Sequence, residues 1–189
     1  MDIASAPLLS IVMFLPLVGA VIIAFLNPEA KDNARWIALW TTLVTFAVSL
    51  FIWFNYDITS GGFQFVEQRG WLDVMKFKLG VDGISVLFVI LTTFLMPLCI
   101  LSAWVAIDTR VKEFMVWLLV MQSGMLGVFL ALDIVLFYVF WELTLVPLYF
   151  MLGIWGGARR VYAAIKFFLY TLAGSLVMMI GVILLIYPL

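Results

Sequence analysis

The sequence predicts an all-α polytopic membrane protein with about six transmembrane helices. Of the 189 residues, 67% are hydrophobic and only 11% are charged, and the mean hydropathy is +1.24. Soluble domains are roughly 45–50% apolar and about 25% charged, so this excess of apolar side chains needs lipid around it. Six separate apolar runs are also long enough to cross a bilayer, because a hydrocarbon core of about 30 Å needs about 20 helical residues.

The predicted spans follow one another in order along the chain. The first has no Lys or Arg before it and no clean cleavage pattern, so it is interpreted as a retained helix and not as a signal peptide. The loop 57–83 has short alternating apolar patterns around Arg69 and Gly70, which predict a small hairpin. The six predicted spans are residues 7–26, 36–56, 84–107, 114–132, 134–155 and 165–187.

The basic residues set the expected orientation. If the spans alternate in direction, seven of the ten Lys and Arg residues lie on one side, and the other three lie in the loop 57–83. Cytoplasmic loops are enriched in Lys and Arg, so we expect the seven-residue side to face the bacterial cytoplasm or the mitochondrial matrix. The N-terminus and the hairpin then face outward. The seven are Lys31, Arg35, Arg110, Lys112, Arg159, Arg160 and Lys166.

Composition argues against several classes of function. The formal net charge of −1 provides no basic field for nucleic acid. The chain has no histidine, and Cys99 is its only cysteine, so the usual ligands of haem and iron–sulfur clusters are missing. No glycine-rich nucleotide motif follows a strand pattern. We therefore expect no redox cofactor, no metal and no nucleic-acid partner in this chain.

A carboxylate interrupts the fifth predicted span. Glu142 lies eight residues after the start of the run 134–155, on the order of 12 Å from the nearer boundary at 1.5 Å per residue. An ionised acid at a helix centre costs roughly 2.5–3.5 kcal/mol, and burial penalises the charged form. The sequence therefore predicts that Glu142 takes up and releases a proton near neutral pH.

Polar side chains accompany Glu142. Helical spacing places Tyr138 and Tyr149 on the face of Glu142. Pro147 leaves the Leu143 carbonyl without its helical donor, so that water or a hydroxyl could bind there. Four residues of the adjacent spans lie at similar depth and could complete a polar seam, although packing alone would also explain each of them: Gln122, Ser123, Thr171 and Ser175.

Two alternatives stay open for the charged groups. A neutral Glu142 could join two helices through one hydrogen bond, and Lys166 could either extend to the membrane interface or relay charge toward Glu142. Lys166 starts several turns from mid-membrane depth, so we expect no direct contact between the two. We expect Glu142 to be buried, with no Lys or Arg of residues 1–189 within hydrogen-bond distance.

Three stretches carry a resemblance to a known family. They are KLGVDGISVLFVILTTFLMPLCILSAW, LFYVFWELTLVPLYFMLGIWGG and KFFLYTLAGSLVMMIG. All three resemble the antiporter-like membrane subunits of the proton-pumping NADH:quinone oxidoreductase, respiratory complex I, and in particular the family called NuoM in bacteria and NADH dehydrogenase subunit 4 in mitochondria. The resemblance runs from about residue 60 to the end and is looser before that.

This resemblance implies a fold of about fourteen helices with two inverted five-helix repeats, each with a broken helix that carries a central lysine. Residues 1–113 would form three N-terminal transmembrane helices with the outward loop 57–83. Residues 114–189 would form helices four to six, the truncated start of the first repeat, so the sequence is expected to be an N-terminal portion. The family's essential glutamate corresponds to Glu142, and its lysine partner would lie on a later helix, outside this chain.

The implied function is that of a proton-translocating membrane-arm subunit, in an enzyme complex where quinone reduction elsewhere supplies the energy. FMN, iron–sulfur clusters and quinone are expected in other parts of the complex. The expected partners are lipid and the other membrane-arm subunits, in a hetero-oligomer of the bacterial inner or mitochondrial inner membrane. Two alternatives are a subunit of a multi-subunit cation/proton antiporter and a purely structural membrane-arm element.

Overall fold

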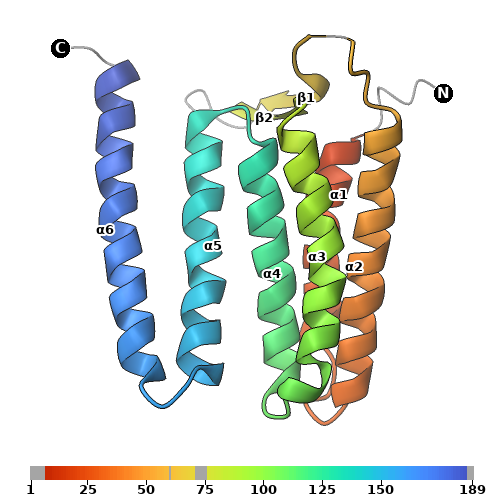
Figure 1. Ribbon diagram of the computed structural model, residues 1–189, viewed down its shortest axis with the longest axis vertical. Coiled ribbons are helices and arrows are strands. Elements are labelled where there is room, and N and C mark those ends of the chain that lie inside the picture. The colour runs from red at the N-terminus through yellow and green to blue at the C-terminus, as the bar shows by residue number, and fades with distance from the viewer. Residues whose placement is uncertain (1–6, 60, 71–75, 187–189) are drawn as a thin grey trace.

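The computed structural model describes residues 7–59, 61–70 and 76–186, and its body is a set of helices that run alternately up and down (Figure 1). Within these residues there are six α-helices, which confirms the predicted fold class. Five are long and apolar enough to cross a membrane, and the first, with 17 residues, is shorter. The helices are α1 (Leu8–Ala24), α2 (Lys31–Phe54), α3 (Ser85–Ala106), α4 (Val111–Leu130), α5 (Ile134–Trp155) and α6 (Arg160–Ile186).

The observed helix bounds agree with the predicted span for α5, and they differ at the starts of α2 and α6. α5 has the predicted bounds because Asp133 precedes it and its Oδ1 accepts hydrogen bonds from the N–H groups of Val135 and Leu136 at 2.9 and 3.1 Å. α2 and α6 begin at Lys31 and Arg160, five residues before the predicted starts. The first turn of α2 is polar, and that of α6 contains Arg160 and Tyr162, so a continuous apolar run starts later than each helix.

A two-stranded antiparallel hairpin covers one end of the helices, as predicted. It consists of β1 (Gln64–Gly70) and β2 (Lys76–Val81), and residues 71–75 between them lie outside the described part of the chain. Leu79 is fully buried and pairs with Ala131 in an isolated bridge, while the Lys78 carbonyl accepts from the Leu132 N–H at 2.9 Å. The hairpin is thereby joined to the α4–α5 connection.

The hairpin also completes the start of α1. This helix has no capping side chain of its own. Glu67 of β1 accepts hydrogen bonds from the Leu9 N–H at 2.7 Å, from the Ser10 N–H and from the Ser10 hydroxyl. A carboxylate at this position satisfies free N–H groups and opposes the positive end of the helix dipole.

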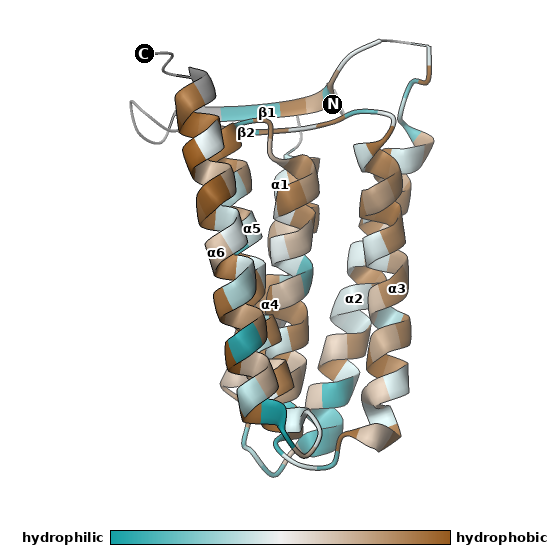
Figure 2. Ribbon diagram, turned by 60° about the vertical axis from the view of Figure 1, so that its left-hand side comes forward, coloured by the Kyte–Doolittle hydropathy of each residue, from teal (hydrophilic) through white to brown (hydrophobic). Residues whose placement is uncertain are grey.

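The helices α1–α4 pack as a bundle, with α5 and α6 following in a row (Figures 1 and 2). Glycines allow the closest approaches: a Cβ at Gly19 of α1 would lie 2.6 Å from Thr41 of α2, and one at Gly127 of α4 would lie 2.4 Å from Phe140 of α5. In its most apolar stretch α4 is 50% buried within the chain, whereas α5 is 17% and α6 is 6% buried. The last two helices therefore leave most of their surface open.

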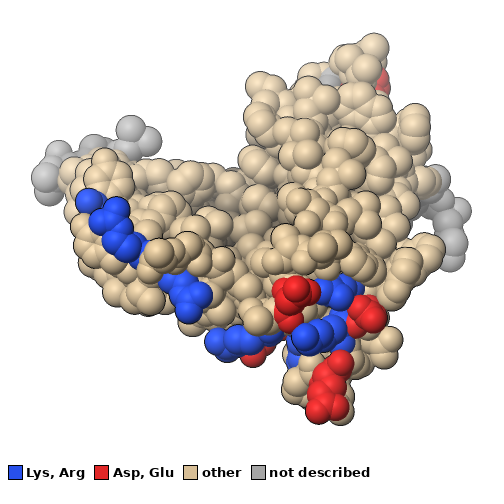
Figure 3. Space-filling view, turned by 60° about the horizontal axis from the view of Figure 1, so that its bottom comes forward, with Lys and Arg blue, Asp and Glu red and all other residues tan. Residues whose placement is uncertain are grey.

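Charged side chains gather at the end of the molecule opposite the hairpin (Figure 3). The starts of α2, α4 and α6 all lie at this end, which places the seven basic residues predicted for one side at one end. Hydrogen bonds join neighbouring connections: Lys31 donates to the Asp108 carbonyl at 2.8 Å, and Lys112 donates to the Leu26 carbonyl at 2.7 Å.

Candidate functional site at Glu142

Glu142 lies in the first half of α5 and is half-buried. Its Oε1 atom is buried and has no hydrogen-bond partner among the described residues. The ion pairs found there involve Arg35 and Arg110 only, so the expectation that no cation of this chain contacts Glu142 is confirmed for the described residues. The expectation of a buried side chain is wrong for this chain by itself, because α6 covers only part of the surface of α5.

The face of α5 that carries Glu142 is turned toward α6. Tyr149, two turns further on, packs against Phe168 of α6 with ring centroids 5.4 Å apart. A Cβ at Gly153 would lie 3.6 Å from Ala164 of α6. Phe140, on the other side of α5, instead contacts Gly127 of α4. At 100° per residue Glu142 is about 200° from Phe140, so it points toward α6 and away from α4.

Two of the predicted neighbours come together with Glu142. The Tyr138 side chain interacts with the Glu142 carboxyl one turn away and with Ser175 of α6. Ser175 is 5% exposed, and its hydroxyl donates to the Leu172 carbonyl at 2.9 Å. Glu142, Tyr138 and Ser175 therefore form a polar group between α5 and α6.

Other predicted residues lie outside this group. Thr171 donates to the Phe167 carbonyl of its own helix at 2.8 Å. Pro147 is buried and lies two turns from Phe140, on the α4-facing side. The ammonium of Lys166 lies 5.7 Å from the centre of the Tyr162 ring, one turn nearer the start of α6. Lys166 thus extends toward the charged end, which favours the interfacial interpretation over the relay.

Gln122 and Ser123 do not share a seam with Glu142. Both are buried, and the Gln122 amide atoms and the Ser123 hydroxyl have no hydrogen-bond partner in the described part of the chain. Gly124 and Gly127 are among the α4 residues that face α5. Gln122 is about 140–200° away from them around the helix, whereas Ser123 is only about 40° from Gly127. The predicted continuous seam is therefore corrected: Gln122 points away from α5, and Glu142 points toward α6 and away from α4, so similar depth does not bring these side chains together.

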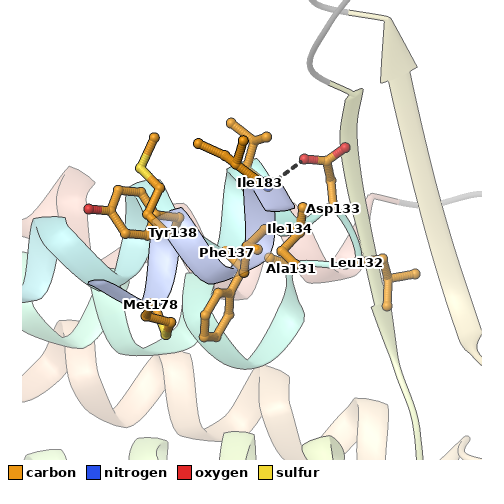
Figure 4. A pocket seen from close by; sticks show the side chains of 11 residues that line it. Ala131, Leu132, Asp133, Ile134, Phe137, Tyr138, Met178 and Ile183 are labelled. Atoms are coloured by element: carbon orange, nitrogen blue, oxygen red, sulfur yellow. Dashed lines mark hydrogen bonds between the residues drawn. The ribbon is translucent and has the colours of Figure 1, made fainter. Parts of the chain in front are cut away.

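A cleft of about 650 Å³ opens between α5 and α6 at the hairpin end (Figure 4). Apolar side chains such as Phe137, Met178 and Ile183 form its walls, and Asp133 and Tyr138 contribute its polar groups. Tyr138, which also interacts with Glu142, is therefore the residue that the cleft and the polar group share. Asp133 was not among the predicted site residues, although an acid directly before an apolar run is a helix-start signal. Met178 and Met179, which also line the cleft, gave no signal in the sequence.

Metal ligands do not converge in the part of the chain that the structure describes, where no group of three or more His, Cys, Asp or Glu side chains is found. What the site offers is one carboxyl group, one phenol and one hydroxyl at the boundary of two helices. Such groups can hold and exchange a proton, and they can bind water.

Comparison with known proteins finds relatives of this chain. Residues 131–189 match a family model described as NADH:quinone oxidoreductase/Mrp antiporter, TM. The NADH-quinone oxidoreductase subunit M of Rhodobacter capsulatus is 53% identical over 180 residues, which are 93% of this chain and 35% of that protein. The NADH-ubiquinone oxidoreductase chain 4 of Marchantia polymorpha is 42% identical over 178 residues, 93% of this chain and 36% of that protein.

A solved structure has the same fold. It is a chain of the membrane-bound sulfane sulfur reductase, an archaeal respiratory membrane complex, with a TM-score of 0.71 at 20% identity, and the match covers 95% of this chain and 37% of that chain. At this identity the likeness concerns the fold alone. The membrane-bound sulfane sulfur reductase thus contains a chain with the same arrangement of helices.

The chain belongs to the antiporter-like membrane subunits of respiratory NADH:quinone oxidoreductases, which confirms the resemblance found in the sequence. Within that family it is similar to the bacterial subunits M and to the proteins named chain 4. The chain spans about a third of the length of these relatives, 35–37%.

Proposed function

We propose that the chain is part of a proton-translocating subunit of an NADH:quinone oxidoreductase, and that Glu142 is the group that takes up and releases the proton. The observation that carries this proposal is the Glu142 Oε1 atom, which is buried at membrane depth without a hydrogen-bond partner among the described residues. This oxygen can therefore still accept a hydrogen bond from water or from a partner outside the described residues. The names of the similar proteins supply the reaction of the complex.

The chemistry of this step is a change of charge at one carboxyl group. A cation that approaches Glu142 favours the ionised form, and its withdrawal favours the protonated form. Since no Lys or Arg of the described residues contacts Glu142, the cation belongs to another part of the assembled subunit. Tyr138 and Ser175 would hold water or pass the proton on the α6 side.

The test of this proposal is Glu142→Gln in the assembled complex. Glutamine keeps the shape and hydrogen-bonding capacity but has no titratable proton, so we expect proton pumping coupled to quinone reduction to fall by about 100-fold while the complex still assembles. Glu142→Asp should retain part of the activity. Glu113→Gln is the matched control, because Glu113 pairs with Arg110 at the charged end. If Glu142→Gln pumped protons at the wild-type rate, the proposal would be wrong, and Glu142 would only join two helices through a hydrogen bond.

A cation/proton antiporter subunit is the second candidate, because the description of the matching family model includes the Mrp antiporter. The two candidates differ in what drives transport. Co-purification with NADH dehydrogenase activity supports the first, and exchange driven by an ion gradient in vesicles without electron transfer supports the second.

The proposed orientation places the charged end toward the bacterial cytoplasm or mitochondrial matrix and the hairpin outside, because seven of ten basic residues lie at that end. In a Cys99→Ser background, a cysteine at Thr59 should react with an impermeant thiol reagent added outside intact cells. A cysteine at Thr109 should react only after the membrane is opened. Labelling of position 109 from outside would reverse the orientation.

A further inference from the structure

A second cleft, of about 530 Å³, lies at the charged end between the last turn of α5 and the first turns of α6. Arg159, Arg160 and Lys166 line it together with the Tyr162 ring. Its apolar part includes Leu152 and Phe167, which are 39% and 36% exposed. A Cβ at Gly157, also in the cleft, would meet nothing within 4 Å. The cleft is therefore open, basic toward the membrane boundary and apolar toward the bilayer.

The cations of this cleft differ from the other four at the same end. Lys31, Arg35, Arg110 and Lys112 each bind an acid or a carbonyl oxygen of this chain. The side chains of the three cleft cations have no ion pair or hydrogen bond among the described residues. After Asp133 the sequence contains one acid, Glu142, at membrane depth. Figure 3 shows this contrast: blue and red side chains mix over one part of the face, and blue stands alone over the other.

We propose that this cleft binds the headgroup of an anionic phospholipid. Basic side chains at the membrane boundary attract anionic headgroups, and arginine binds phosphate oxygens with two parallel N–H groups. Lys166 already extends toward the boundary, over the Tyr162 ring. Leu152 and Phe167 provide apolar contact for the glycerol and the first acyl carbons below the phosphate. A lipid uses both parts of the cleft, whereas a free phosphate ion or an acidic protein segment would use the basic part alone.

The experiment measures phosphatidylglycerol binding by the purified, delipidated complex. The variant R159Q/R160Q/K166Q removes the three cations. Each basic residue near an anionic surface contributes about a fivefold gain in affinity, so we expect binding about 100-fold weaker. The variant R159K/R160K/K166R keeps the charge and should bind within about tenfold of wild type. The matched control K31Q/R110Q/K112Q removes the same charge from the same end, where each cation has a partner in the chain, and should bind like wild type.

Four results would overturn the proposal. Unchanged lipid binding by R159Q/R160Q/K166Q would show that the cleft is not a lipid site, and equal weakening by the control triple would show a general effect of net charge. Full displacement of phosphatidylglycerol by inorganic phosphate, together with unchanged lipid binding by Phe167→Ser, would show a phosphate site without a lipid component. Loss of a neighbouring subunit from the R159Q/R160Q/K166Q complex with lipid retained would show that an acidic protein segment is the occupant.

Discussion

Half of the most apolar stretch of α4 is buried inside this chain, whereas only 6% of the corresponding stretch of α6 is buried. Helix α6 is longer and more apolar than α4, so hydropathy alone would not predict that less of α6 is buried within the chain. The difference lies in their neighbours: α4 packs against α1, α2, α3 and α5, while α6 packs along α5. Helices α1–α4 therefore form a bundle that is largely complete within the chain, and α5 and α6 present a surface for other protein or for lipid.

Both regions contain polar groups, but the acid at membrane depth, Glu142, lies between α5 and α6. In the bundle, the Ser49 and Thr93 hydroxyl oxygens lie 2.7 Å apart, and each also lies within hydrogen-bond distance of a carbonyl of its own helix, so both hydroxyls have partners. Between α5 and α6, the Glu142 carboxyl retains a buried oxygen without a partner in the described residues. Glu142 thus lies on the open surface of α5 and α6, where a partner from outside these residues can reach its carboxyl group.

The largest expected effect is on the free energy of unfolding, when one methyl group is added to a glycine in each of the two regions. Gly127→Ala would place a Cβ 2.4 Å from the Phe140 ring, so α4 and α5 must separate, and we expect a loss of roughly 1–3 kcal/mol in the free energy of unfolding. Gly174→Ala is the matched control in α6, where a Cβ would meet nothing within 4 Å of this chain, and it should be neutral or stabilising. Chemical unfolding of the purified subunit measures both.

An equal loss from both variants would contradict this comparison. It would mean that another helix covers the Gly174 side of α6 as closely as α5 covers Gly127 of α4. The open surface would then be a property of residues 1–189 and not of the assembled subunit.

A smaller effect is expected at Gln122, inside the bundle. Its amide is fully buried and neither polar atom has a partner among the described residues, and such a group costs about 1–3 kcal/mol. Gln122→Met should therefore raise the free energy of unfolding by about 1 kcal/mol and leave proton pumping unchanged, in contrast to Glu142→Gln. Reduced pumping by Gln122→Met would return Gln122 to the proton path and weaken the division between the two regions.

The smallest effects are expected at two helix starts, one in each region. Asp82 accepts from the N–H groups of Ile84 and Ser85 before α3, as Asp133 does from Val135 and Leu136 before α5. Each Asp→Ala change should cost about 1 kcal/mol, as measured by chemical unfolding at neutral pH. A cost confined to Asp133→Ala would show that the bundle holds α3 without its cap.

The Asp82 cap also predicts a pH dependence. Its hydrogen bonds with Ser85 lower the pKa of Asp82 below the ordinary 3.8. The cap is therefore fully ionised above pH 3.8, and its contribution is lost as the pH falls through the lower value of the folded state. The difference in stability between wild type and Asp82→Ala should be constant near neutral pH and shrink in acid.

The sequence was sufficient for the fold class, the hairpin and the number of helices, because lipid imposes length and hydropathy on every span. The bounds of α5 were predictable from its apolar run. The starts of α2 and α6 were not, since charged and polar side chains in their first turns interrupt the apolar runs. The face of each residue was also not predictable: Gln122 and Glu142 lie at similar depth, yet the glycines of α4 turn Gln122 away from α5. Which side of a helix is covered depends on neighbours that a single sequence does not reveal.

The carboxylate of Glu67 has a consequence for the order in which this chain can be completed. It caps backbone groups that lie 57 and 58 residues earlier in the sequence. During synthesis, α1 and α2 are both made before residue 67 exists, so the first turn of α1 must wait with its N–H groups uncapped. The segment that caps it must then arrive on the same side of the membrane as the start of α1. The first helix is thus finished by a residue that the ribosome delivers after the second helix.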